Sequence, residues 1–183
     1  MKKFYKTFFN EINNLLSQTD INSLDKIAKA LISFKKKKSK VIIFGNGGSA
    51  AISSHVSVDL TKNAKVRCIN FNEADLLTCF SNDYGYEKVF SKSLEFYADI
   101  GDIVIIVSSS GRSKNLLEAA KICKKKKIKL CTLTGFSKSN PLKKMGDINL
   151  WVNSKAYNII ENIHQIWLLS IVDRIIGRME YSA

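Results

Sequence analysis

The sequence lacks several features that mark common classes of protein. None of its four cysteines forms a Cys-x-x-Cys pair, and 183 residues include one proline and two histidines. We therefore interpret the cysteines as reduced, structural side chains rather than as a disulfide framework. No apolar run is long enough to cross a membrane. Asn10 and Glu11 interrupt the apolar N-terminus, so no signal peptide is predicted and we expect a cytosolic protein with no membrane partner.

The net charge of +13 raises the question of a nucleic-acid partner. Much of this charge lies in two lysine runs, residues 35–38 and 124–127. Each run falls where a helix is expected to end before a strand, and lysines there complement the helix dipole and stay solvated. No aromatic residues interleave with them, as a base-stacking surface requires. Nucleic-acid binding is therefore the less favoured interpretation, although such a surface attracts an anionic substrate.

Strand-like and helix-like segments alternate along the chain, which is typical of a parallel sheet covered by helices on both faces. The sequence predicts an α/β fold: a three-layer α/β/α sandwich with a five-stranded parallel sheet and an N-terminal helical pair. A single domain is expected over residues 1–183. Strands are expected at 40–44, 66–71, 103–107, 128–134 and 148–152. Helices are expected at 2–17, 20–36, 49–62, 73–80, 86–97, 116–125 and 157–177, with a short one at Pro141 and a break at 81–85.

The most informative feature is a strand-to-helix turn that occurs twice, at residues 41–56 and 102–121. In each copy a β-branched apolar run ends at a Gly/Ser-rich loop and a helix is expected to follow. Such a turn directs backbone N–H groups and the positive end of a helix at one point, which suits an anion. Neither turn has a P-loop lysine or GxGxxG spacing, so no nucleotide cofactor is predicted. A sugar phosphate fits better.

The second turn carries more hydroxyl groups than a helix cap requires. Ser108, Ser109 and Ser110 follow the buried strand directly, and Ser113 comes three residues later. A helix cap needs one such side chain, whereas several together suit an oxyanion. Arg112 adds a guanidinium group that can meet a phosphate.

Two helices carry the residues with the chemistry for proton transfer or metal binding. His55 and Asp59 share one helix face, and so do Glu161 and Gln165, with His164 one residue away. Histidine and carboxylate side chains together bind divalent metals or move protons. The same spacing also fits ordinary surface residues, so spacing alone leaves both interpretations open.

Five segments of the chain together resemble one protein family. In order along the sequence they read FGNGGSAA, SNDYGYEKVFS, VSSSGRSKN, TLTG and ENIHQ. This set resembles the SIS (sugar isomerase) domain, which has a flavodoxin-like sheet. Within that family it is similar to the phosphoheptose isomerases, which convert sedoheptulose 7-phosphate to glycero-manno-heptose 7-phosphate. The resemblance spans nearly the whole chain.

The resemblance assigns roles to residues of this sequence. It implies catalytic roles for His55, Asp59 and Glu161, and a zinc ion held by these three with Gln165. It also implies a homotetramer with shared sites, with residues 1–37 used in packing. The residues that it places at the substrate are Asn46, Gly47, Gly48, Ser49, Asn82, Asp83, Ser108, Ser109, Ser110 and Ser113.

Three positions depart from the pattern of the family. Asp59 stands where the family has a glutamate, Glu161 where it has a glutamine, and Leu169 where it has a second catalytic histidine. For an isomerase, we expect Asp59 or Glu161 to remove the proton next to the carbonyl, with His55 polarising the oxygens. Leu169 favours the alternative, a non-catalytic SIS module that senses a sugar phosphate or binds a protein partner.

Overall fold

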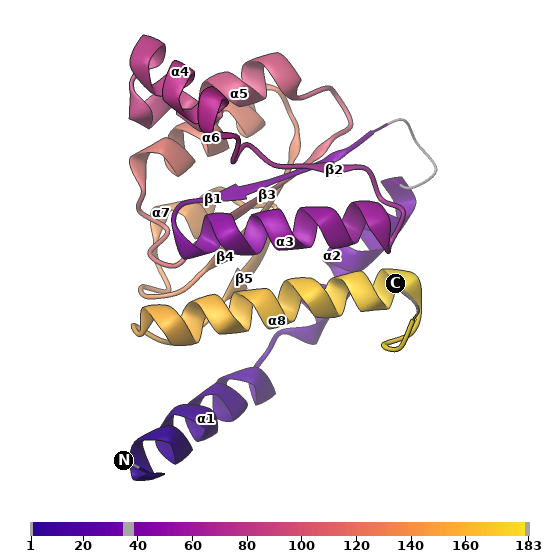
Figure 1. The fold of residues 1–183 in the computed structure, drawn as a ribbon, viewed down its shortest axis with the longest axis vertical. Coiled ribbons are helices and arrows are strands. Elements are labelled where there is room, and N and C mark those ends of the chain that lie inside the picture. The colour runs from indigo at the N-terminus through magenta and orange to yellow at the C-terminus, as the bar shows by residue number, and fades with distance from the viewer. Residues whose placement is uncertain (1, 35–38, 182–183) are drawn as a thin grey trace.

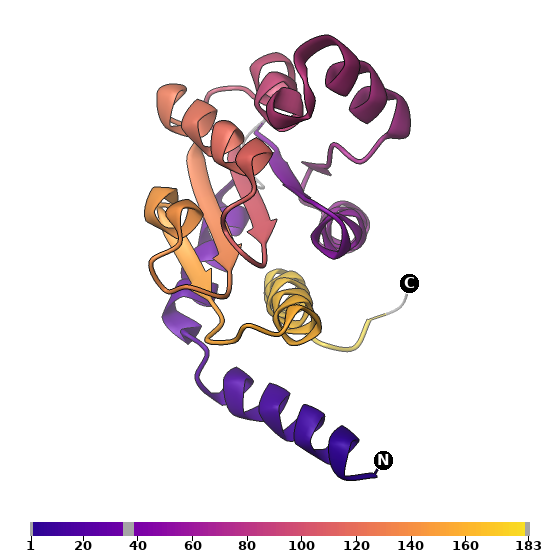
Figure 2. The same cartoon turned by 90° about the vertical axis from the view of Figure 1, so that its left-hand side faces the viewer.

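The computed structural model describes residues 2–34 and 39–181. Figure 1 shows the order of the elements and Figure 2 shows their layers. The lysine run at 35–38 lies outside the described residues. The elements are α1 (Lys2–Ser17), α2 (Ile21–Phe34), β1 (Val41–Gly45), α3 (Gly48–Lys62), β2 (Cys68–Ile69), α4 (Ala74–Tyr84), η1 (Tyr86–Lys88), α5 (Val89–Tyr97), β3 (Ile103–Ser108), α6 (Lys114–Lys125), β4 (Lys129–Thr134), α7 (Pro141–Met145), β5 (Ile148–Trp151) and α8 (Tyr157–Ile176).

The five strands form one parallel sheet, as the sequence predicts, and the structure gives their order as β2-β1-β3-β4-β5. Every residue of β3 is buried, which is expected for a central strand covered on both faces. Alternate residues of β3 enter two separate cores. Ile103 and Ile105 pack with residues of α2, α3 and α8, whereas Val104 and Ile106 pack with residues of α5 and α6. The three-layer prediction is therefore confirmed.

Several elements differ from their predicted bounds by a few residues, and two of the differences are the largest. The edge strand β2 is limited to Cys68–Ile69, because the chain then turns and the Asn72 side-chain Nδ2 donates to the Ala50 carbonyl of α3 at 2.8 Å. The predicted break at 81–85 is also wrong. Helix α4 continues to Tyr84 and ends at Gly85, whose φ of 81° is accessible mainly to glycine.

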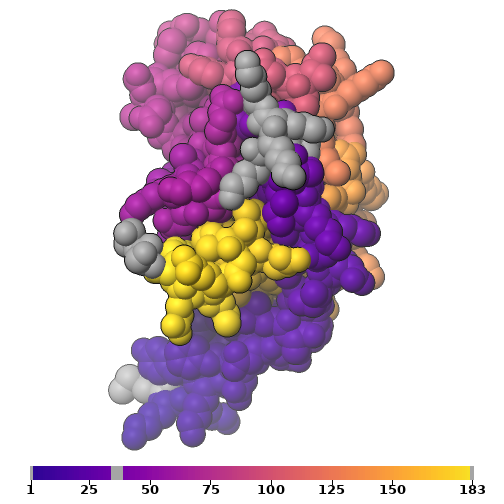
Figure 3. Space-filling model, turned by 90° about the vertical axis from the view of Figure 1, so that its right-hand side faces the viewer, coloured from indigo at the N-terminus to yellow at the C-terminus, as the bar shows by residue number. Residues whose placement is uncertain are grey.

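The two N-terminal helices differ in how much of their apolar surface is buried against the rest of the protein. Helix α2 packs against α8, and Asp20 caps it by accepting a hydrogen bond from the Ser23 amide at 3.1 Å. Figure 3 shows the end of α8 at the surface, bordered by α2 and α3. By contrast, Leu15 alone is buried on α1, and Figure 1 shows this helix extending away from the body. Within the described ranges, no helix is long and apolar enough to cross a membrane.

Charged side chains close the amino-terminal edge of the sheet. Asp102 is buried; it accepts hydrogen bonds from the Lys40 and Asp99 amides, each at 2.9 Å, and pairs with the Lys40 ammonium at 2.7 Å. At the next strands, Asp147 accepts from the Leu130 amide at 2.8 Å. These bonds satisfy the carboxylates and fix the starts of β1, β3 and β4.

Candidate functional site

The two Gly/Ser loops meet at the carboxyl-terminal edge of the sheet, where α/β folds of this kind place their ligands. They enclose a cavity of about 110 Å³ together with the start of α8. Its lining contains most of the predicted phosphate-loop residues and the predicted carboxylate of α8. The lining residues are Asn46, Ser49, Ser108, Ser109, Ser110, Ser113, Leu116, Tyr157 and Glu161.

The loop at residues 108–113, called the serine loop below, has a defined shape and one hydroxyl group without a hydrogen-bond partner in the described part of the chain. The Ser108 hydroxyl accepts the Gly111 amide at 3.1 Å, and Gly111 has a φ of 63°. Ser109 is buried, and within the described residues its hydroxyl has no hydrogen-bond partner. A buried polar group without a partner is uncommon and requires an explanation. An oxyanion in the cavity that Ser109 lines would supply the missing partner.

A pair of asparagines joins the two loops. The Asn46 and Asn115 side chains exchange two hydrogen bonds, each 3.0 Å long. The Tyr86 hydroxyl also donates to Asn46, at 3.0 Å. Sequence reasoning missed Asn115 and Tyr86 as site residues. Both belong to segments of the family resemblance, but only the folded chain places them beside Asn46.

A second cavity of about 400 Å³ lies beside the first and is lined by Gly48, Ala51, Ile52, His55, Glu161, Asn162 and Gln165. Glu161 lines both cavities. The two ring nitrogens of His55 have different partners: Nε2 lies 3.3 Å from Asp59 Oδ2, and Nδ1 lies 3.4 Å from Gln165 Nε2. The structure thus brings together the predicted proton-transfer residues of α3 and α8.

Glu161 approaches the first loop closely. A Cβ atom on Gly48 would overlap the Glu161 carboxylate, so the absence of a side chain at Gly48 makes room for it. Gly48 is the first residue of α3. The carboxylate therefore lies at the positive end of that helix, where negative charge is stabilised. Gly47 lines neither cavity; it precedes α3 with a φ of 55° and gives the loop its turn.

Asn82 and Asp83 are not brought to either cavity within one chain. They lie on the last turn of α4, where both are exposed, and Asn82 donates to Asp83 at 2.9 Å. Asp59 also lines neither cavity. Its carboxylate accepts a hydrogen bond from the Asn63 side-chain Nδ2 at 3.1 Å and contacts His55.

His164 does not replace the histidine that the family has at the position of Leu169. It is fully buried, and its Nε2 lies 3.2 Å from the Thr134 carbonyl oxygen. Burial lowers its pKa to about 4. Leu169 is partly buried and packs against the core. His55 is consequently the histidine of this chain that reaches the cavities.

The described residues of one chain do not form a complete zinc site. In residues 2–34 and 39–181, no group of three or more His, Cys, Asp or Glu side chains is placed to hold a metal ion. His55 and Asp59 form a pair, but Gln165 adds only an amide to them. Three protein ligands are the usual minimum for zinc.

With this geometry in place, the chain can be compared with known proteins. It matches the SIS domain family over residues 5–135, and it belongs to that family. Its similarity extends to phosphoheptose isomerases. Those of Buchnera aphidicola and Sulfurimonas denitrificans are each 33% identical to it, over 86% of both chains for the first and over 90% of this chain and 89% of the relative for the second. A phosphoheptose isomerase structure from Neisseria gonorrhoeae has the same fold, with a TM-score of 0.88, 24% identity, and coverage of 95% of this chain and 98% of that one.

Proposed function

We propose that this protein is a phosphoheptose isomerase that converts sedoheptulose 7-phosphate to glycero-manno-heptose 7-phosphate. The observation that carries the proposal is the meeting of two Gly/Ser loops at one cavity beside the Glu161 carboxylate. Backbone and hydroxyl donors suit a phosphate, and a carboxylate suits the proton transfer of an aldose–ketose isomerisation. The relatives that cover most of the chain carry this enzyme name, which favours catalysis over a sensor or partner-binding module.

The reaction needs a base next to the substrate carbonyl. The base removes a proton from the adjacent carbon, an enediolate forms, and the proton returns to the neighbouring carbon. We assign this role to Glu161 rather than Asp59, because Glu161 lines both cavities and Asp59 lines neither. Asp59 instead holds His55, together with Gln165. His55 lines the second cavity with Glu161, and it would exchange its Gln165 contact for a substrate oxygen to move the remaining proton between the two enediolate oxygens.

The experiment that tests the proposal is an NMR assay of sedoheptulose 7-phosphate in D₂O with the purified protein. We expect an aldose product and deuterium at the carbon that exchanges its proton. Glu161→Gln should lower kcat by about 10²–10⁴-fold, because a positioned base contributes that much. Asp59→Asn should cost less. Absence of product and of deuterium exchange would reject the isomerase, and full exchange by Glu161→Gln would transfer the role of base to Asp59.

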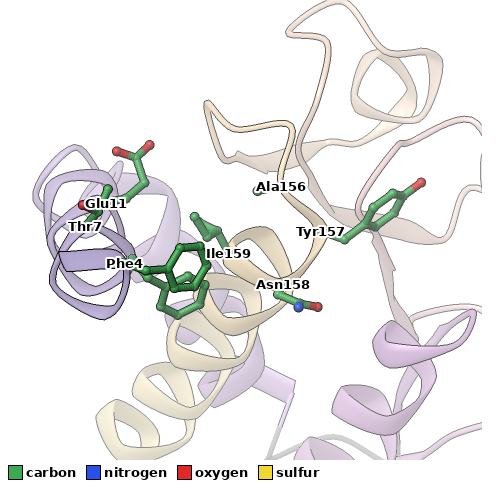
Figure 4. A pocket seen from close by; sticks show the side chains of 8 residues that line it. Phe4, Thr7, Glu11, Ala156, Tyr157, Asn158 and Ile159 are labelled. Carbon is green, nitrogen blue, oxygen red and sulfur yellow. The ribbon is translucent and has the colours of Figure 1, made fainter. Parts of the chain in front are cut away.

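The homotetramer and its shared sites are part of the proposal, and helix α1 supports them. Phe4 is 70% exposed and Phe9 is 59% exposed, although both are large and apolar. A cavity of about 490 Å³ between α1 and the start of α8 is lined by Phe4 and Ile159 among others, as Figure 4 shows. Such an apolar surface is typical of a protein interface. In an assembly, a second subunit is the source from which Asn82 and Asp83 would reach a cavity.

Light scattering coupled to size-exclusion chromatography tests the assembly. Phe9→Glu should convert a tetramer to smaller species and lower activity. The matched control is Ile100→Glu, which changes an apolar residue that is 93% exposed in the loop before β3. This control should remain a tetramer. A wild-type monomer with full activity would reject both the assembly and the sharing of sites.

Zinc, the cytosolic location and the pathway stay predictions from the resemblance. Metal analysis of the purified protein tests for zinc, and no step assigned to Glu161 or His55 depends on it. Cell fractionation tests the location. The heptose phosphate product would serve as a precursor for lipopolysaccharide or capsule, and loss of heptose from these glycans in a deletion strain tests the pathway.

A further inference from the structure

A fully buried asparagine lies directly behind the serine loop. Asn140 precedes α7 and is 0% exposed. A Cβ atom on Gly111 would overlap the Asn140 carboxamide, so the loop backbone rests against this side chain. Gly111 has a φ of 63°, a conformation that side chains other than that of glycine disfavour. The conformation of the serine loop at this contact therefore depends on both Gly111 and Asn140.

The Asn140 carboxamide is held in one orientation by the segment that follows β4. Its Nδ2 donates to the Thr134 hydroxyl at 3.1 Å and to the Ser137 carbonyl at 2.8 Å. Its Oδ1 accepts from the Lys143 amide at 2.9 Å and so caps α7. The donor and acceptor sides of the amide are both used, and the side chain has no freedom to rotate away from the loop.

Backbone hydrogen bonds join the same segment to the serine loop. The Gly135 amide donates to the Ser109 carbonyl at 2.8 Å, and the Leu142 amide donates to the Gly111 carbonyl at 3.2 Å. Asn140 lies between these two connections in the sequence. Residues 134–142 thus support the serine loop from behind, on the side away from the cavity that Ser108, Ser109 and Ser110 line.

We propose that Asn140 is a positioning residue that fixes the serine loop in the shape that binds the substrate phosphate. The proposal rests on the proposed function, because it assigns the phosphate to this loop. Asn140 does not line the cavity, so it acts through Gly111. Binding donors that are already in place avoid the entropic cost of ordering the loop when the ligand arrives. Loss of Asn140 should therefore weaken phosphate binding more than it slows the chemical step.

The chain provides a matched control in Asn149. This residue is also beside a glycine, Gly146, whose Cβ would overlap its carboxamide, and it also bonds to a threonine hydroxyl, that of Thr132. Asn149 lies in β5, and Gly146 precedes that strand, at the edge of the sheet opposite the cavity. A change at Asn149 perturbs the same kind of contact without touching the serine loop.

The test compares Asn140→Ser and Asn149→Ser in the full-length protein. Serine at 140 still caps α7 but no longer reaches Gly111. We expect the KM for sedoheptulose 7-phosphate and the inhibition constant of inorganic phosphate to rise about tenfold in Asn140→Ser, with kcat within about twofold. Asn149→Ser should leave both constants unchanged. Equal constants in Asn140→Ser and wild type, or equal rises in the two variants, would overturn the proposal.

A second variant keeps the test decisive if Asn140→Ser does not fold. Asn140→Asp retains the oxygen that caps α7 and the size of the side chain, but replaces the amide donor with a negative charge behind the loop. Its KM and its phosphate inhibition constant should rise by more than tenfold, and wild-type values would overturn the proposal. If the wild-type protein itself binds neither sedoheptulose 7-phosphate nor inorganic phosphate, the proposed function fails instead.

Discussion

The two edges of the sheet use their polar groups in opposite ways. At the amino-terminal edge, Asp102 is buried and both of its oxygens have partners. At the carboxyl-terminal edge, the buried Ser109 hydroxyl has no partner within the described residues, and Glu161 faces two cavities. The first edge has its polar groups satisfied internally, which stabilises the fold. The second presents a hydroxyl and a carboxylate to these cavities, which suits a ligand.

The largest expected effect is the loss of stability on removing the buried Asp102 carboxylate at the amino-terminal edge of the sheet. Asp102→Ala leaves the Lys40 ammonium, which is largely buried, without its buried partner. We expect the free energy of unfolding to fall by about 3–5 kcal/mol, as for one half of a buried ion pair. Urea unfolding at pH 7 measures it. The control, Asp99→Ala, removes an exposed partner of the same lysine and should cost less than about 1 kcal/mol. Equal losses in the two variants would contradict the assignment.

Acid should destabilise the fold through His164, which packs at the carboxyl-terminal edge of the sheet. Burial lowers the pKa of this histidine from 6.5 to about 4. Between these values the unfolded chain binds a proton that the folded chain does not, so unfolding is favoured as the pH falls from 6.5 towards 4. The contribution, present in full above pH 6.5, is about 3 kcal/mol. Between pH 6.5 and pH 4, the free energy of unfolding should fall more steeply with falling pH for the wild type than for His164→Gln. Parallel curves of the two proteins would contradict this role of His164.

A smaller effect is expected from the amide pair that joins the two loops. Asn115→Ala leaves the Asn46 amide without its main partner, and we expect the KM for the phosphosugar to rise about tenfold. The control is Asn72→Ala, since Asn72 is also a partly buried amide that ties a loop to α3, and it lines neither cavity. It should lower stability and leave KM unchanged. A larger change in KM for Asn72→Ala would refute the role of the pair.

The smallest effect sharpens the comparison most, because stability and binding should move in opposite directions. Ser109→Ala removes a buried hydroxyl without a partner, so stability should stay equal or rise by up to about 1 kcal/mol. KM should rise by roughly three- to tenfold. Ser93→Ala is the control: its buried hydroxyl donates to the Val89 carbonyl at 2.9 Å, and its loss should lower stability by about 1 kcal/mol. Steady-state kinetics and thermal unfolding of both variants test this prediction. If Ser109→Ala is destabilised and has a normal KM, Ser109 serves the structure and not ligand binding.

Local sequence patterns predicted most of the fold because the relevant forces act over a few residues. The wholly apolar run at β3 indicates a strand covered on both faces, and the Gly/Ser turns mark where strands end. One prediction failed where a distant contact decides: the edge strand β2 is short because the Asn72 side chain bonds to Ala50 of α3. The other failed for a local reason: α4 continues through Asn82 because Gly85, rather than Ser81, ends it.

The sequence by itself determined the α/β class, the two Gly/Ser loops and the candidate proton carriers, since residue type and spacing dictate these properties. Only the tertiary structure decided how the carriers differ. Packing of α8 buried His164 against Thr134 and left Glu161 beside Gly48, and residues on one helix cannot be assigned such surroundings from spacing alone. The pairing of Asn46 with Asn115, 69 positions apart, likewise exists only because parallel strands bring their carboxyl ends to one edge.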